Sequence, residues 1–375
     1  MNATASIESD QLENIQWKQL WSLAALYASI IIGWIAYHSY QPKLLVKFNF
    51  TQFTVWLLVA QGIILVLTPP IAGKLGDRFR FKQGHRLPII STGISFAAMV
   101  FMAVAFALLT NPNELFRWIF PVLIILWLIA MSIFTSPALS TLELFTPIEK
   151  LPKAMAVLTI VSNLVYSLEP VILDIIDYLG APVTFIVGGV AVFASGYALK
   201  KSSLSLFNSN EGKPRAAMTL DTQRSEYGLI LLVGIGLGLA TTIPFNYFPE
   251  LLGAKLAAIT GGMDGKWILV GMLVLSAIFS LPISNVVFKV GMIKTFWISF
   301  VISLMSIGLL FILTNTFSVV IITVIFTLAF TALSVSSLPL AISRSNYYEK
   351  VFCVGIFFSG VAIPNGIVEI SKAIQ

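Results

Sequence analysis

Runs of about twenty apolar residues recur along almost the whole chain. Eleven runs can be distinguished, near residues 17–40, 51–73, 87–110, 118–140, 154–177, 180–199, 226–247, 267–288, 295–314, 317–341 and 351–371. A helix of about 20 apolar residues is long enough to cross a bilayer, and it satisfies its own backbone hydrogen bonds there. Only 11% of the 375 residues are charged, against about 25% in a typical soluble domain. The sequence therefore predicts an all-α, polytopic transmembrane protein.

The lysines and arginines give this map an orientation. If the polar segment 1–16 is placed in the cytoplasm, only six of the 23 basic residues fall on outer segments, and the other 17 fall on inner ones. The outer six are Lys43, Lys47, Arg117, Lys255, Lys266 and Lys372. Such a bias is the positive-inside rule, which predicts a cytoplasmic N-terminus in a plasma membrane or bacterial inner membrane. Segment 1–16 lacks the basic start and cleavage site of a signal peptide.

Several classes of function are disfavoured by the same residues. The net charge of +6 is spread over short loops, whereas nucleic-acid binding needs basic residues gathered on one face. Cys353 is the single cysteine, and His38 and His85 lie on different segments, so no disulfide or clustered metal site is expected. No cofactor is predicted.

A long polar segment divides the chain after the sixth run. It extends from Lys200 almost to Glu226, and it separates a predicted N-terminal six-helix bundle at 17–199 from a C-terminal bundle at 226–375. Two helical bundles joined by a cytoplasmic linker, here 200–225, are the arrangement of transporters built from repeated halves. An ordinary long cytoplasmic loop is the alternative interpretation.

The basic segment Gly73–Arg86, GKLGDRFRFKQGHR, follows the second apolar run and is expected to be a short cytoplasmic loop. Its pattern of Gly73, Leu75, Asp77, Arg78 and Lys82 resembles the signature between spans 2 and 3 of the major facilitator superfamily. Arg80 stands where that signature has its second glycine, and Phe81 replaces a basic residue. The chain is thus identified as similar to this family of secondary transporters.

The resemblance implies two pseudo-repeated helical bundles, alternating access and a protein that acts as a monomer. It also implies that Gly73, Asp77 and Arg78 form a conformational latch between the halves on the cytoplasmic side. The family has twelve spans, and eleven are read here. Either the last helix is missing from this sequence, the C-terminus lies outside, or two short spans are merged between 226 and 266, where Pro244 and Pro249 could break a helix.

Polar side chains inside apolar spans are candidates for the transport site, because they are costly in a membrane. Glu169 is the candidate for proton coupling, since a carboxyl group in a transport pathway can take up and release a proton. Asn163, Tyr166 and Glu169 follow one another at i, i+3 and i+6, which places them on one broad helix face. The alternative role for Glu169 is a cap or brace between helices near the outer surface.

The first span offers Trp34, Tyr37 and His38. Aromatic faces with interspersed hydrogen-bonding groups suit a sugar or another polar organic solute. An aromatic belt at the membrane interface is an equally good explanation.

The remaining candidates are isolated polar residues in other spans. Gln61, Asn246 and Thr331 are predicted to line the solute site, although such residues also serve to hydrogen-bond or pack helices together. Glu369 pairs with Asn365 at i+4 in the last run, and Asp174 and Asp177 lie near the outer end of the fifth. These acidic residues are weaker candidates.

The expectation is therefore a permease or symporter that moves a small polar organic solute through the bilayer, with a proton or another cation as coupling ion. A membrane-embedded enzyme acting on lipid-linked substrates is one alternative, and it should show an acidic or histidine cluster at an interface. A helical scaffold or sensor without net transport is the other, and it should have a dry interior.

Overall fold

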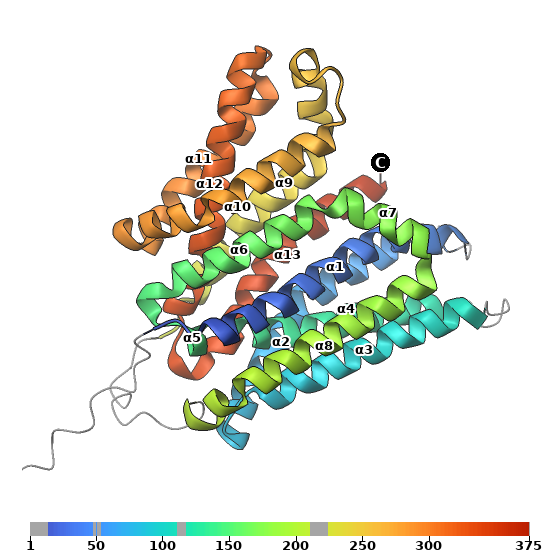
Figure 1. The fold of residues 1–375 in the computed structure, drawn as a ribbon, viewed down its shortest axis with the longest axis vertical. Coiled ribbons are helices and arrows are strands. Elements are labelled where there is room, and N and C mark those ends of the chain that lie inside the picture. Colours follow the sequence, from blue (N-terminus) through green and yellow to red (C-terminus); the bar gives the residue numbers. More distant parts are fainter. Residues whose placement is uncertain (1–13, 48–49, 51–53, 111–117, 211–223, 375) are drawn as a thin grey trace, which may run out of the picture.

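The computed structural model describes residues 14–47, 50, 54–110, 118–210 and 224–374, and all regular secondary structure in these ranges is helical (Figure 1). The first half contains α1 (Trp17–Lys47), α2 (Thr54–Gln83), α3 (Leu87–Thr110), α4 (Ile119–Ser140), α5 (Leu142–Phe145), η3 (Ile148–Lys150), α6 (Leu151–Ser167), α7 (Glu169–Leu179) and α8 (Ala181–Asn210). The second half contains α9 (Tyr227–Thr260), α10 (Gly265–Val290), α11 (Met292–Ile312), α12 (Thr316–Ser343), η5 (Tyr347–Glu349) and α13 (Lys350–Ile374).

The predicted spans are confirmed in this part of the chain. Ten helices are long and apolar enough to cross a membrane, and η3 with α6 and α7 form an eleventh, bent span with an angle of 55°. The bend follows Ser167, just before Pro170 at the start of α7. Proline lacks a backbone donor, and the first helical turn is the position that accommodates it best.

Three expectations about boundaries need correction. The segment Gly73–Arg86 is not a loop, because α2 continues as a helix through Gln83. Residues 226–266 do not hold two merged spans, since α9 is one helix despite Pro244 and Pro249. The linker expected to begin at Lys200 starts later, because α8 runs on to Asn210. The predictions for residues 1–13 and 211–223 concern segments outside the described residues.

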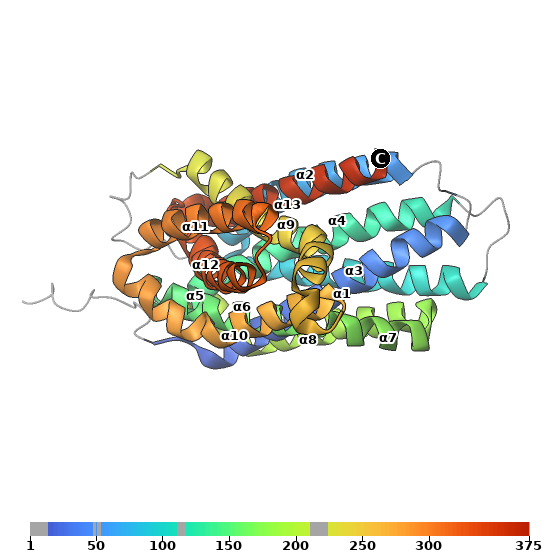
Figure 2. The ribbon, with the colours of Figure 1, turned by 90° about the horizontal axis from the view of Figure 1, so that it is seen from above.

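Two groups of helices make up the molecule (Figure 1). In the first, α3 packs against α4 and α8, and α8 also packs against α1. In the second, α12 packs against α10 and α11, and α10 packs against α9. The groups meet mainly along two helix pairs, α2 with α13 and α6 with α10, and α6 also packs against α12 and α4 against α13. Figure 2 shows α2 and α13 side by side.

Glycines permit the close approach of α2 and α13. A Cβ atom on Gly73 would collide with the backbone of Val351, and one on Gly355 would collide with the backbone of Pro69. Small residues at membrane helix contacts let backbones approach, which strengthens their packing where lipid offers no hydrophobic drive. This pair therefore forms a tight seam between the two halves.

The two ends of the helix assembly differ in chemistry. The basic end is the end that carries Arg80, Arg86 and Lys350. At this end α2 is followed by α3, α4 is followed through α5 by α6, and α12 is followed by α13. The opposite end is where α7 turns into α8 and α9 turns into α10. This distinction decides how the site between the halves is reached.

Candidate functional site

A cavity of about 860 Å³ lies between the two helix groups. Its wall is built by α1, α2, α4, α6 and α7 from the first half and by α9, α10, α12 and α13 from the second. At the opposite end the wall includes Asp264 and Lys266, which are exposed, and toward the basic end it stops at the buried Leu139 and Leu338. The cavity is therefore reached from the opposite end.

Seven of the nine residues predicted to contact the solute or couple a proton line this cavity. They are Trp34, His38, Gln61, Asn163, Tyr166, Glu169 and Asn246. They come from four separate segments of the chain, α1, α2, α6–α7 and α9, and the fold brings all of them to one wall.

Tyr37 and Thr331, the other two, are buried behind the wall. The Tyr37 hydroxyl donates to Gln61 Oε1 at 2.9 Å, and its ring stacks on Trp127 at 4.6 Å between centroids. The Thr331 hydroxyl lies 2.7 Å from Ser276 Oγ, which also accepts from Asn163 Nδ2 at 2.8 Å. Both residues therefore hold wall residues in place, because their helices present them to neighbouring helices.

Glu169 begins α7, directly after the bend that breaks the fifth span. Its carboxylate lines the cavity, and within the described chain no lysine or arginine forms an ion pair with it. A carboxyl group at the start of a helix also interacts favourably with the helix dipole.

Glu369 on α13 is held toward the cavity by residues from both halves. Gln61 Nε2 donates to Glu369 Oε2 at 3.0 Å, and Asn365 Nδ2 donates to Glu369 Oε1 at 2.8 Å. His38 Nδ1 lies 3.9 Å from the same Oε1 atom. Glu369 was a weaker candidate in the sequence, and its i+4 spacing from Asn365 was the signal that could have pointed to this position.

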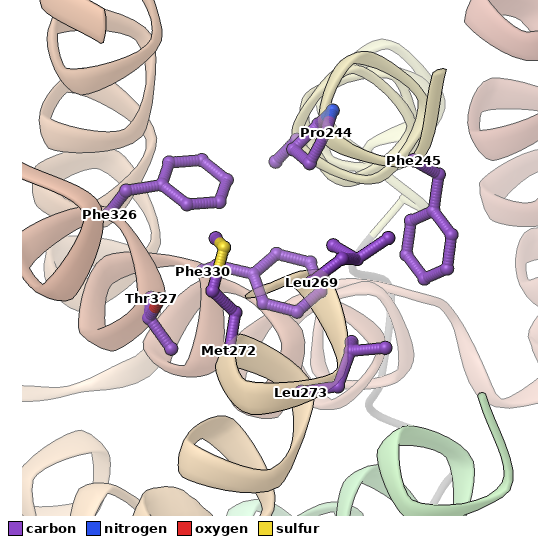
Figure 3. Close-up of a pocket in the computed structure, with 9 residues that line it drawn as sticks. Pro244, Phe245, Leu269, Met272, Leu273, Phe326, Thr327 and Phe330 are labelled. Carbon is purple, nitrogen blue, oxygen red and sulfur yellow. The ribbon is translucent and has the colours of Figure 1, made fainter. Parts of the chain in front are cut away.

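A small recess adjoins the cavity between α9, α10 and α12 (Figure 3). Phe326, Phe330 and Met272 project toward its centre, and its volume is about 10 Å³. That space is enough for about one water molecule, and the lining is apolar except for Thr327, whose hydroxyl is bonded to Thr323 O. This recess is a packing defect beside the larger cavity.

The basic end is closed by contacts from Asp77 to the start of α13. Asp77 Oδ1 accepts from the Val351 N–H at 3.2 Å, and Oδ2 accepts from the Phe352 N–H at 2.9 Å. The carboxylate on α2 thus satisfies two first-turn donors of a helix in the other half, where the helix dipole favours negative charge.

Arg80, not Arg78, joins Asp77 in these contacts. Arg78 is exposed, whereas Arg80 is buried and donates to the Tyr347 carbonyl at 3.1 Å. The Arg80 guanidinium also lies 4.2 Å from the centre of the Tyr347 ring, within cation–π range. The residue that departs from the family pattern thus links α2 to η5 in the second half.

A buried carboxylate that the sequence analysis overlooked completes this end. Glu143 on α5 is 2.8 Å from Arg86 Nη2, 2.7 Å from Lys350 Nζ and 3.7 Å from Arg80 Nη1. Its side chain is only 8% exposed, so its charge depends on these cations for compensation. The sequence signal that could have identified Glu143 is an acidic residue just after the fourth span, at the same end of the molecule as the basic segment Gly73–Arg86.

Comparison with known proteins agrees with this geometry. The model of the Major Facilitator Superfamily matches residues 22–367. The chain belongs to the Major Facilitator Superfamily. A membrane-spanning transporter is the class of protein that this membership and the fold support, in preference to an enzyme.

Two solved structures of transporters share the Major Facilitator Superfamily fold with this chain. The human organic anion transporter MFSD10 (TETRAN) is 10% identical, with a TM-score of 0.69 over 96% of this chain and 93% of that one. A bacterial homologue of the iron transporter ferroportin, in an outward-facing state, is 16% identical, with a TM-score of 0.64 over 94% and 91%. A search of curated protein sequences gave no match.

Proposed function

We propose that this protein is a secondary active transporter that moves a small polar organic solute by alternating access. The observation that carries the proposal is the cavity of about 860 Å³ between the two halves, which is reached from one end and closed at the other. Rocking of two bundles around a fixed central site is the mechanism that such an arrangement serves.

The direction in which the cavity faces follows from the basic residues. Under the positive-inside rule, the basic end and the N-terminus lie in the cytoplasm of a plasma or bacterial inner membrane. The cavity then faces outward, and Asp77, Arg80 and Glu143 close the cytoplasmic side. The latch proposed for Gly73, Asp77 and Arg78 thus operates through Asp77 and Gly73, with Arg80 in the place of Arg78.

The lining supports an organic solute with polar groups. Trp34 and Tyr166 offer aromatic faces, and the amides of Gln61, Asn163 and Asn246 also line the wall, each hydrogen-bonded to a neighbouring group of the protein. A largely apolar wall with a few placed polar groups is typical of sites that bind small organic molecules. A scaffold protein with a dry interior fits this wall poorly, and so does an enzyme for lipid-linked substrates.

Glu169 is the group that we propose for proton coupling. It lines the cavity at a helix break and has no lysine or arginine as an ion-pair partner in the described residues. A proton could therefore exchange with its carboxylate without breaking a salt bridge.

The test begins with the purified protein and a thermal-shift screen of sugars, amino acids, nucleosides, carboxylates and cationic drugs. A saturating ligand stabilises the folded state by mass action, by about 2.7 kcal/mol at one hundred times Kd. Each protein, wild type, Glu169→Gln or Asp177→Asn, is then reconstituted into proteoliposomes, and uptake of any hit is measured under an inward proton gradient. Asp177 is the control, because it is exposed and pairs with Lys43 outside the cavity.

We expect solute accumulation that depends on the proton gradient in wild type and Asp177→Asn, and loss of that dependence in Glu169→Gln. Unchanged proton dependence in Glu169→Gln removes the coupling role while leaving transport intact. Absence of uptake or exchange for every class of solute in the screen overturns the transport function.

A further inference from the structure

We propose that the transported solute is an organic cation, whose charge is balanced by Glu369 and whose body lies against the aromatic wall of the cavity. This inference rests on the proposed transport function and narrows the class of solute. It is carried by four observations: the charge of the wall, the way Glu369 is held, the aromatic groups that line the same cavity, and a hydroxyl that the protein leaves without a partner.

The wall of the cavity carries more negative than positive charge. Its acidic residues are Glu169, Asp174, Asp264 and Glu369, and its one permanently cationic residue is Lys266. Asp264 is engaged locally, since it caps α10 by accepting from the Lys266 N–H at 3.0 Å. Clefts lined by one sign of charge concentrate solutes of the opposite sign, so this cavity attracts cations and repels anions.

Glu369 is oriented but not neutralised by its neighbours. The two amides of Gln61 and Asn365 donate one hydrogen bond to each of its oxygens, and neutral amides fix a carboxylate without removing its charge. Lys372, one turn further along α13, bonds instead to Asn246 Oδ1 at 3.0 Å. Of the described residues, only His38 comes within 4 Å as an ion-pair partner, at 3.9 Å, and its imidazole is not a permanent cation.

Aromatic side chains line the same cavity as this carboxylate. Trp34 lies on the cavity wall and stacks on His38 with 5.9 Å between ring centroids. His38 Nδ1 in turn lies 3.9 Å from Glu369 Oε1. Tyr166 and Phe245, 5.2 Å apart, lie on the same wall from α6 and α9, and Phe358 lies there from α13. A ligand cation over such ring faces is attracted electrostatically by the negative face of each ring.

Ser136 supplies an independent indication that the cavity is built for a ligand. It lies on α4 at the inner part of the wall and is fully buried, yet its hydroxyl has no hydrogen-bond partner among the described residues. Buried polar atoms without a partner are rare in folded proteins, and each one calls for an explanation. Because the hydroxyl is shielded from the cavity in this arrangement, a solute with an amino or hydroxyl group satisfies it only after the inner part of the wall shifts.

The experiment compares probes that differ in charge but share a ring. Purified protein in lipid nanodiscs is titrated by calorimetry with benzyltrimethylammonium, benzyl alcohol and benzoate, and tetraphenylphosphonium serves as a larger cation. We expect saturable binding of at least one cation, with an affinity at least tenfold above that of benzyl alcohol and benzoate. This comparison needs only the wild-type protein, so it does not depend on how a variant folds.

Glu369→Gln then locates the counter-charge. The isosteric change keeps the side-chain volume, and we expect it to weaken cation binding about tenfold or more while Asp177→Asn leaves the affinity unchanged. A retained gel-filtration profile shows that the variant is folded.

Three results would overturn the inference: equal or tighter binding of benzoate or benzyl alcohol, no binding of either cation, or unchanged cation affinity in Glu369→Gln. The transport proposal survives each of them if the solute screen yields a neutral or anionic solute that proteoliposomes accumulate or exchange. Failure of the transport proposal is a distinct result, because it requires that the protein carries no solute of any charge.

Discussion

At the level of single residues, the basic end shows how few side chains close the structure. Asp77 contributes a carboxylate that accepts two backbone hydrogen bonds from α13, and Glu143 contributes a buried charge shared by three cations. Hydrogen bonds to charged groups each contribute about 1.5–3 kcal/mol. Because the two acids lie on the first half and their partners include the second, they stabilise the arrangement in which this end is shut.

Asp77→Asn is predicted to loosen the basic end. The amide keeps one acceptor oxygen but loses the charge that favours the start of α13, so the open arrangement should gain about tenfold in population. Cys353, the single cysteine of the chain, is buried beside these contacts and reports the change through its rate of alkylation by N-ethylmaleimide. We expect that rate to rise about tenfold.

The control for this experiment is Asp264→Asn. Asp264 also accepts a backbone N–H at the start of a helix, but it is exposed and lies at the opposite end. Its variant should leave the alkylation of Cys353 unchanged. Equal rates for wild type and Asp77→Asn would contradict a closing role for Asp77.

Glu143→Gln is predicted to lower stability strongly. Removing the carboxylate leaves Arg80, Arg86 and Lys350 buried without their shared counter-charge, and breaking a buried ion pair in this way costs about 3–5 kcal/mol. The melting temperature of the purified protein should fall by several degrees. Glu226→Gln is the matched control, because the Glu226–Arg344 pair is about a third exposed and such pairs contribute about 1 kcal/mol or less.

The positions of the candidate residues were predictable from the sequence to the extent that they depend on helix periodicity and polarity. Trp34, Asn163 and Glu169 line the cavity as expected, because a polar or amphipathic side chain in an apolar span has few other uses, and their roles in transport stay predictions. Tyr37 and Thr331 share helices with wall residues but face neighbouring helices, and the rotation of a helix about its axis is set by packing that a single sequence does not show. Glu143 was missed because it resembles an ordinary acid in a loop.

At the level of elements, the seam between α2 and α13 couples the two halves. The backbones are close enough that Gly73 and Gly355 have no room for a Cβ atom. Asp77 and Gly73 lie one turn apart on α2, so the hydrogen bonds to α13 depend on the close approach that glycine allows.

Gly73→Ala is predicted to open this seam. The added methyl group would collide with the Val351 carbonyl, a backbone atom that cannot rotate away, and overpacking of this kind costs about 1–3 kcal/mol. We expect a lower melting temperature and faster alkylation of Cys353. Gly271→Ala in α10 is the control, since its Cβ atom would meet nothing within 4 Å; a loss of stability of the same size there would show that the effect is not specific to the seam.

The extent of the helices was partly predictable. Hydrophobic runs located all eleven spans, because transfer into lipid is the main determinant of where a span lies. The hydrophobic runs did not predict where a helix ends beyond its apolar part. Helix α2 continues through Asp77 and Arg80, because these charged residues have partners in the other half. The bend after Ser167 could have been read from Pro170.

At the level of the whole molecule, the two halves are joined along the whole α2–α13 seam and by further contacts near the basic end. The seam of α2 with α13, the contact of α6 with α10 through Asn163 and Ser276, and the cluster around Glu143 all connect the halves. A rocking motion that exposes the cavity to the basic end must break the Asp77 and Glu143 contacts. In the alternating-access cycle that we propose, the stability of those contacts sets the balance between the two arrangements.

The outward-facing arrangement that we propose predicts which positions can be labelled from outside the cell. In a Cys353→Ser background, Thr241→Cys places a thiol on the cavity wall, and Lys153→Cys places one on the exposed surface at the basic end. A membrane-impermeant methanethiosulfonate added to intact cells should modify Thr241→Cys and leave Lys153→Cys unmodified until the membrane is permeabilised. A solute that occupies the cavity should slow the first reaction, because it covers the same wall. If Lys153→Cys reacted first in intact cells, the basic end would face outward, and both the orientation and the outward-facing assignment would have to be reversed.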